Sequence, residues 1–256
     1  MSFSQTSVEL MKYFLDDFDK YSKKITSKDQ ESLDKIFKQF WWDIKISDGL
    51  IERYDKNDML QTELIKHKKS NDLFESKFVP SNVKRYVEVN MIGYLQVKTY
   101  LCNVEVEVIY GLFKKSDMNN LRKVKKRIKK ALRILRFLLF YVGSSNKVKK
   151  ITLNLYLTNL KKILPRNQIK TLSENNCNSA LTYACAEEGE VLIFREEEWK
   201  KVLIHELFHS LCLDFSGISY LTLKDRIKGL LNVKSDYEIS EAYSEFWATI
   251  LNSCFI

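Results

Sequence analysis

The chain has 256 residues, of which 42 are Lys or Arg and 33 are Asp or Glu, so the formal net charge is +9. Only 7 Gly and 2 Pro occur, a composition that excludes collagen-like, linker-rich and turn-dense all-β proteins. No apolar run approaches the roughly 18 residues of a membrane helix, because Arg136 interrupts the longest candidate, 134–142. The first residues also lack the pattern of a secretory signal. We therefore expect an intracellular protein with no membrane partner.

Residues 1–79 are expected to form a helical N-terminal region. Three stretches carry apolar residues at helical spacing: 7–21, from Asp29 to Trp41, and more weakly 58–68. Pro80 interrupts this pattern, and residues 80–256 are expected to form a second domain. The sequence does not show whether the first region covers a cleft of the second domain or only packs against that domain.

The second region alternates strand and helix patterns. Residues 83–113 are rich in Val, Ile and Tyr with apolar alternation, which predicts two or more strands. The later predicted elements are a helix over 117–141 capped by Ser116 or Asp117, strands over 151–157, 180–184 and 191–194, and helices over 196–213 and 240–252. The order predicts an α+β fold.

The five cysteines are scattered along the chain at Cys102, Cys177, Cys185, Cys212 and Cys254. No C-x-x-C pair occurs, which excludes a zinc ribbon and a thioredoxin-like redox motif. With no export signal, we expect reduced and mostly buried thiols.

Two of the three histidines form the pattern H-E-x-x-H at His205, Glu206 and His209. Residues four apart on a helix project from the same face, so both imidazoles can bind one metal ion. The carboxylate between them lies beside that face, where it can deprotonate a metal-bound water. Two metal-free histidines on an amphipathic helix are the alternative, which the cost of burying polar groups without partners disfavours.

A catalytic zinc ion needs a third protein ligand and an open fourth position. No histidine follows His209, and the metzincin extension H-x-x-G-x-x-H is absent. A carboxylate must therefore supply the ligand. Asp214 is too close to the end of the predicted helix to fold back easily, which leaves candidates further along the chain: Asp225, Asp236, Glu238, Glu241 and Glu245.

Residues 241–248, E-A-Y-S-E-F-W-A, resemble the E-x-x-[AS]-[DE]-x-[FW]-A pattern of gluzincin metallopeptidases, zincins in which a second helix supplies a glutamate ligand. The resemblance implies that Glu241 is the third ligand and that Glu245 orients a ligand histidine through a hydrogen bond. The assignment of Glu245 as the ligand stays open as the alternative. The implied cofactor is one Zn²⁺ ion per chain.

The same resemblance implies a zincin-like domain with a twisted mixed sheet, a backing helix, an active-site helix and a glutamate helix, preceded by the helical N-terminal region. An edge strand beside the active-site helix would bind an extended peptide by strand addition. Its expected residues are Asn178, Ser179, Ala180, Leu181 and Thr182. The run from Arg195 to His209 is also similar to the R-x-E-E-W-x-K-V-x-I-H-E-x-x-H run in zincin-like proteins of large DNA viruses.

These features predict a zinc-dependent metallopeptidase that acts on a peptide or protein substrate, with Glu206 as the general base. Tyr220 and Tyr237 could donate to the oxyanion of the transition state, although packing is the favoured interpretation. One alternative is a catalytically silent zincin-like binding or virion protein, which the intact Glu206 disfavours.

The other alternative is a basic nucleic-acid-associated protein that uses the run 122–130. Apolar residues recur at helical spacing within this run, and no aromatic residue interleaves it. We therefore interpret it from sequence as the solvated face of a buried helix, and nucleic acid is not the expected partner.

Overall fold

The computed structural model describes residues 26–66, 72–119, 121–143, 147–163, 165, 172–214, 221–231 and 238–255. The helix predicted over 7–21, and the residues Asp236, Tyr220 and Tyr237, lie outside these ranges. The chain divides into two compact units, residues 1–43 and 44–256. The candidate site belongs to the second unit.

Helix α2 (Ser27–Lys56) begins in the first unit and ends in the second. A capping box starts it, because the backbone N–H of Thr26 donates to Asp29 and the backbone N–H of Asp29 donates back to the Thr26 hydroxyl. Within the first unit, large apolar side chains of this helix are exposed: Leu33, Ile36, Phe37, Trp41 and Trp42. The part in the second unit buries Ile44 and Ile51.

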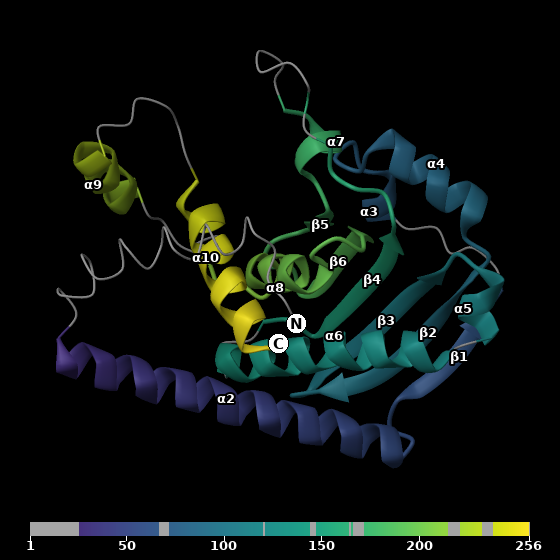
Figure 1. Ribbon diagram of the computed structural model, residues 1–256, viewed down its shortest axis with the longest axis horizontal. Helices are drawn as coiled ribbons and strands as arrows, with labels where there is room; N and C mark the ends of the chain where they lie inside the picture. The colour runs from purple at the N-terminus through teal and green to yellow at the C-terminus, as the bar shows by residue number, and fades with distance from the viewer. Residues whose placement is uncertain are drawn as a thin grey trace, which may run out of the picture. The chain divides into compact units, whose positions relative to one another are not determined.

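The second unit is built on a six-stranded mixed sheet of order β1-β2-β3-β4-β6-β5 (Figure 1). The strands are β1 (Gln61–Ile65), β2 (Gly93–Leu101), β3 (Val104–Leu112), β4 (Lys150–Thr158), β5 (Ala180–Thr182) and β6 (Glu188–Arg195). The strands β1, β2 and β3 pair antiparallel, β3, β4 and β6 pair parallel, and β5 returns antiparallel to β6. The short strand β5 is therefore an edge strand.

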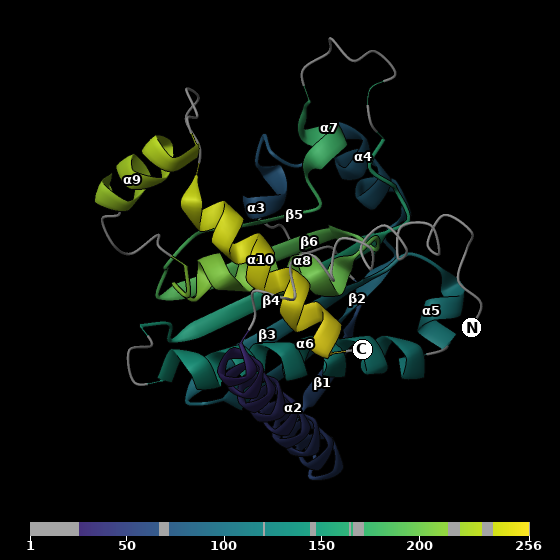
Figure 2. The ribbon, with the colours of Figure 1, turned by 60° about the vertical axis from the view of Figure 1, so that its left-hand side comes forward.

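Helices cover both faces of this sheet. Helices α3 (Asp72–Glu75) and α4 (Ser81–Asn90) pack on one face, in an apolar cluster that includes Phe74, Val83, Leu192 and Phe194. Helices α6 (Leu121–Val142) and α8 (Trp199–Ser210) pack on the opposite face (Figures 1 and 2). Helix α6 is also the crossover between the parallel strands β3 and β4.

The remaining helices are α5 (Lys115–Asn119), α7 (Glu174–Cys177), α9 (Leu221–Leu231) and α10 (Ile239–Cys254). Helix α10 packs on α8, as Figure 2 shows. None of the helices in the described ranges is both long enough and apolar enough to span a membrane. The structure therefore has the α+β class and the mixed sheet that were expected, with helices and strands that differ from the predicted order at several places.

Two local predictions are wrong. The stretch 58–68, predicted as a weak helix, contains strand β1, whose register against β2 runs from Gln61 opposite Lys98 to Ile65 opposite Tyr94. Residues 83–90, predicted as strand, are part of α4. Val83 and Val87 are buried four residues apart while Val89 is 76% exposed, which is a helical and not an alternating pattern.

Helices α7 and α9 have no counterpart among the predicted elements. Other differences concern element boundaries. The helix predicted over 117–141 is divided into α5 and α6, and residue 120 lies outside the described ranges. Helix α5 starts at Lys115, so Ser116 and Asp117 lie inside it and not at its cap. The domain boundary expected after residue 79 stays a prediction; the compact units divide after residue 43, and β1 belongs to the sheet of the second unit.

Candidate metal centre

Helix α8 carries His205, Glu206 and His209. Its apolar side chains Leu203, Ile204 and Leu207 are fully buried, so burial against the sheet fixes the rotation of the helix. The two imidazoles then project one turn apart, with ring centroids separated by 4.8 Å.

Helix α8 approaches strand β6 closely at Gly189. A Cβ atom at this position would lie 2.8 Å from the Ser210 hydroxyl oxygen, closer than side-chain atoms are found. Glycine at this position therefore lets the C-terminal end of α8, which carries His209, lie directly on the sheet.

Helix α10 brings the third group to the centre. Ser244, Ala248 and Leu251 are buried on one side of this helix, which packs on α8, and the ring of Tyr243 contacts that of Phe208. Glu241, in the first turn of α10, then faces the two histidines.

The donor atoms of three side chains converge at this centre. The Nε2 atoms of His205 and His209 lie 3.1 Å apart. Oε2 of Glu241 lies 3.2 Å from Nε2 of His205, and its Oε1 lies 3.4 Å from Nε2 of His209. Among the described residues these three form the group of side chains that could hold a metal ion.

A carboxylate lies behind each imidazole. Nδ1 of His209 donates a hydrogen bond of 2.5 Å to Oδ2 of Asp214, whose side chain is fully buried. Nδ1 of His205 lies 3.3 Å from Oε2 of Glu245, at ion-pair distance but outside hydrogen-bond geometry. Glu245 also accepts a hydrogen bond from Lys201. With Nδ1 directed to a carboxylate, each ring presents its Nε2 atom to the centre.

The charges at this centre depend on one another. Burial raises the pKa of the Glu206 carboxyl to about 7, although the charges of the two histidines partly oppose this. Burial disfavours a charge on His209, but the hydrogen bonds to Asp214 and Glu241 outweigh it and raise the pKa of His209 to about 10. The hydrogen bonds from His205 and His209 hold the pKa of Glu241 far below its usual range. The centre therefore stabilises a positive charge between Glu241 and the two rings.

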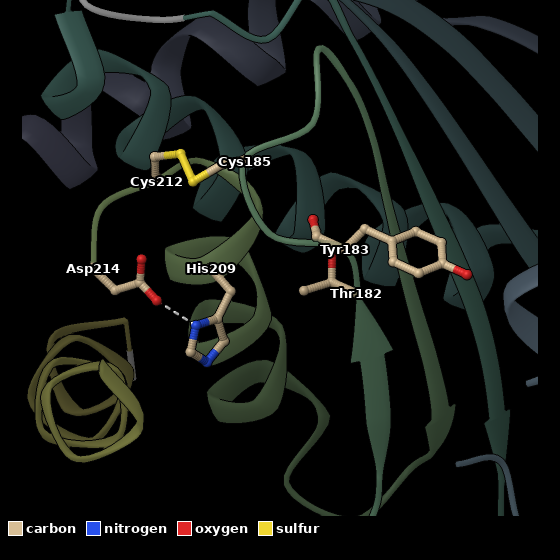
Figure 3. Close-up of a disulfide and its surroundings, with 6 residues drawn as sticks. All are labelled: Thr182, Tyr183, Cys185, His209, Cys212 and Asp214. Atoms are coloured by element: carbon tan, nitrogen blue, oxygen red, sulfur yellow. Dashed lines mark hydrogen bonds and ion pairs between the residues drawn. A yellow bond between two sulfur atoms is a disulfide. The ribbon is translucent and has the colours of Figure 1, made fainter. Parts of the chain in front are cut away.

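The chain reverses direction sharply after α8. The backbone N–H of Leu213 donates to the carbonyl of Phe208 and that of Cys212 donates to the carbonyl of His209, with Cys212 at a φ of 55°. This is a Schellman ending with cysteine at the left-handed position that glycine usually takes. The turn brings Asp214 back to His209, as Figure 3 shows.

A disulfide between Cys185 and Cys212 crosses from this turn to the loop between β5 and β6 (Figure 3). The backbone N–H of Cys185 also donates to the carbonyl of His209, at 3.2 Å. The disulfide therefore joins the loop beside the edge strand to the end of the helix that carries His209.

The structure brings together the predicted residues His205, Glu206, His209, Glu241 and Glu245. It also places the predicted edge-strand residues Ala180, Leu181 and Thr182 in β5, which packs against α8, with Asn178 and Ser179 directly before it. Two other carboxylates considered as ligands do not join the centre: Asp225 is exposed on α9, and Glu238 precedes α10 near Lys224. Asp236 lies outside the described residues.

Two sequence interpretations are corrected here. Asp214 does fold back to the centre, not as a third ligand but as the partner of Nδ1 of His209, because the turn after α8 reverses the chain. The cysteines are not all reduced and buried: Cys185 and Cys212 form a disulfide, and Cys102 and Cys177 are exposed. No short spacing motif connects the paired cysteines, which are 27 residues apart.

No protein-family model, curated protein or solved structure matches the chain. The functional assignment therefore depends on the site itself.

Proposed function

We propose that the chain is a zinc-dependent metallopeptidase of the zincin type, with His205, His209 and Glu241 as the zinc ligands. The observation that carries this proposal is the convergence of two imidazole nitrogens and one carboxylate within 3.4 Å of one another. Glu206 lies next to the first of these ligands on the same helix.

The donor set fits zinc in its chemistry and in its size. Two imidazoles with one glutamate are a known ligand set of catalytic zinc, which leaves a fourth position open. Ligands at about 2.0–2.1 Å from a tetrahedral zinc ion lie roughly 3.3 Å from one another. The separation of the two Nε2 atoms, 3.1 Å, agrees with that value, and each Nε2 atom lies 3.2 or 3.4 Å from one of the two carboxylate oxygens of Glu241. Glu241 is 61% exposed, so the centre is open to solvent on its side.

A bound zinc ion supplies Lewis acidity, which polarises a carbonyl group and lowers the pKa of a water. The role of the protein is to move the proton. Glu206 takes a proton from the water while the water oxygen attacks the carbonyl carbon of the peptide. It then gives this proton to the amine nitrogen as the C–N bond breaks. Its raised pKa, about 7 without a metal, suits a group that must both accept and release a proton.

The edge strand β5 supports a peptide as the substrate. Among the described strands it pairs only with β6, so its other edge is available for an extended chain. The same strand packs against α8, which carries the histidines. A peptide added to β5 would therefore run beside the proposed zinc site.

The test combines metal analysis with peptide cleavage. We expect about one zinc ion per purified chain and cleavage of a peptide library that a chelator abolishes. Glu206→Gln should keep the metal and lose at least about a hundredfold in turnover, because a general base contributes on the order of 10²–10⁴. His205→Ala should lose the metal. Glu63→Gln, an exposed glutamate on β1, is the matched control and should change neither.

Two results would contradict the proposal. Wild-type protein that neither contains nor takes up zinc would exclude the ligand assignment. A Glu206→Gln variant with unchanged turnover would exclude the proposed base. Stoichiometric zinc without cleavage of any peptide would instead support the silent binding protein.

A further inference from the structure

Apart from Arg136, which donates to the Ser47 hydroxyl, the basic side chains on helix α6 fall into two groups. The first group forms ion pairs within the second unit: Lys129 contacts Glu52 and Asp55 of α2, and Arg133 contacts Asp48. Arg127 pairs with Glu196 at the end of β6. These ion pairs connect α6 to α2 and to the residue after β6, and they engage the acidic side chains of these neighbours.

The second group has no acidic partner among the described residues. It consists of Arg122, Lys123, Lys125, Lys126 and Lys130, called here the basic face. All but Lys130 are exposed. Burial and then the positive charge of Lys200, Lys126 and other neighbours lower the pKa of Lys130, so positive charge accumulates here without compensation. The sequence alone favours a solvated helix face at this run, and the absence of counter-charges is what the structure adds.

The basic face borders an open groove of about 970 Å³ between α6 and the C-terminal part of α2. Seven of the side chains that line this groove are Lys or Arg. The two acids in its lining, Glu52 and Asp55, are both engaged by Lys129. The groove is therefore a concave surface with a net positive charge, which concentrates anions.

The shape and the composition of this surface favour duplex nucleic acid over a lipid surface or a single strand as the partner. From Arg122 to Lys130 the helix rises about 12 Å, over which duplex nucleic acid carries roughly seven phosphate charges. The apolar side of α6, including Val124, Ile128 and Leu132, is buried, so the helix cannot insert this side into a lipid surface. The groove is lined by no aromatic side chain, and single strands bind mainly by stacking on such side chains.

We propose that the basic face binds the phosphate backbone of double-stranded nucleic acid without reading its sequence. This surface is distinct from the proposed zinc site and needs no metal. Duplex binding should therefore be the same whether or not the protein binds zinc or cleaves peptides.

The test is fluorescence anisotropy with a labelled 24-base-pair DNA duplex of arbitrary sequence, from about 50 to 200 mM salt. If all five cations contact phosphates, the logarithm of the binding constant falls with that of the salt concentration with a slope of about −4.5. The triple variant R122E/K123E/K126E should bind at least about tenfold more weakly and reduce the slope to about −2. The triple variant K98E/K147E/K161E changes the same net charge at exposed lysines elsewhere and should bind almost as the wild type does.

Parallel measurements use an RNA duplex, a single strand, polyglutamate and vesicles that contain phosphatidylserine. Binding to both duplexes identifies the phosphate backbone as the ligand, and binding to one of them identifies the type of duplex. The proposal is overturned by no duplex binding at 50 mM salt or by equal weakening in both triple variants. Tighter binding to the single strand, polyglutamate or vesicles overturns it equally and identifies another partner.

Discussion

Asp214 accepts a hydrogen bond of 2.5 Å from Nδ1 of His209, and its side chain is completely shielded from solvent. This bond keeps the hydrogen on Nδ1, so Nε2 is the nitrogen that faces the centre shared with His205 and Glu241. A buried carboxylate behind the ring also increases its basicity. The hydrogen bond to Asp214 therefore determines both the orientation of the His209 ring and its charge.

We expect Asp214→Asn to weaken zinc binding by about 10–100-fold, because the amide keeps the shape of the side chain but removes its charge. Competition with a chromophoric chelator measures the dissociation constant. Asp225→Asn is the matched control, since Asp225 is an exposed acid on α9. Unchanged zinc affinity in Asp214→Asn would show that this hydrogen bond does not support the ligand.

Zinc binding should release protons and strengthen as the pH rises. Without a metal the pKa of His209 is raised to about 10, so Nε2 carries a proton at neutral pH that a metal must displace. The apparent binding constant should therefore rise by about tenfold per pH unit and level off above pH 10. Calorimetry at pH 8 in two buffers of different ionisation enthalpy counts the released protons.

A water bound to the zinc ion would also lose a proton, so proton release by the wild type must be compared with that of a variant. Asp214→Asn lowers the pKa of His209 but keeps the water, and it should release fewer protons than the wild type at pH 8. Equal proton release in the two proteins would contradict a histidine held protonated by Asp214.

The centre was partly predictable because much of it is local. His205, Glu206 and His209 share one helix, where spacing alone determines which side chains meet. Glu241 required a resemblance in sequence, since no local rule places α10 against α8. Asp214 was missed because its position depends on the turn after α8, in which a cysteine and not a glycine takes the left-handed conformation.

The errors in secondary structure have a different cause. The spacing of Val83, Val87 and Val89 fits both a strand and a helix, and only packing against the sheet decides between them. Strand β1 is five residues long and mostly exposed, so it carries little apolar pattern of its own. Its pairing with β2 stabilises it, and such long-range pairing is not visible in a local window.

Reduction of the disulfide between Cys185 and Cys212 should destabilise the fold. Its cysteines are 27 residues apart, and closing a loop of that length stabilises a protein by about 3–4 kcal/mol in the chain-entropy description. Urea unfolding with and without a dithiol reductant measures the change, and the double variant C185S/C212S should reproduce it. Zinc affinity should also fall, because Cys212 lies two residues from Asp214 (Figure 3).

The exposed Cys177 provides the control for this experiment. Cys177→Ser should have the same urea midpoint as the wild type, both with and without the reductant. A midpoint that does not depend on the reductant in the wild type would show that the disulfide does not hold the native fold.

The close contact between Gly189 and Ser210 leads to a prediction on how α8 lies on the sheet. Gly189→Ala should reduce the free energy of unfolding by about 1–3 kcal/mol, because its Cβ would lie 2.8 Å from the Ser210 hydroxyl oxygen. That hydroxyl is buried and has no hydrogen-bond partner among the described residues, so Ser210→Ala alone should be nearly neutral. The double variant should recover most of the loss, since it removes the clashing oxygen.

Urea unfolding of the four proteins gives the coupling energy between the two positions. Gly229→Ala is the control, because Gly229 lies in α9 with no atom near the added methyl group, and it should be neutral or slightly stabilising. Zinc affinity should fall in Gly189→Ala and return in the double variant, because a displaced α8 moves His209 relative to Glu241. Additive changes in stability would contradict the direct contact between helix and sheet that positions His209.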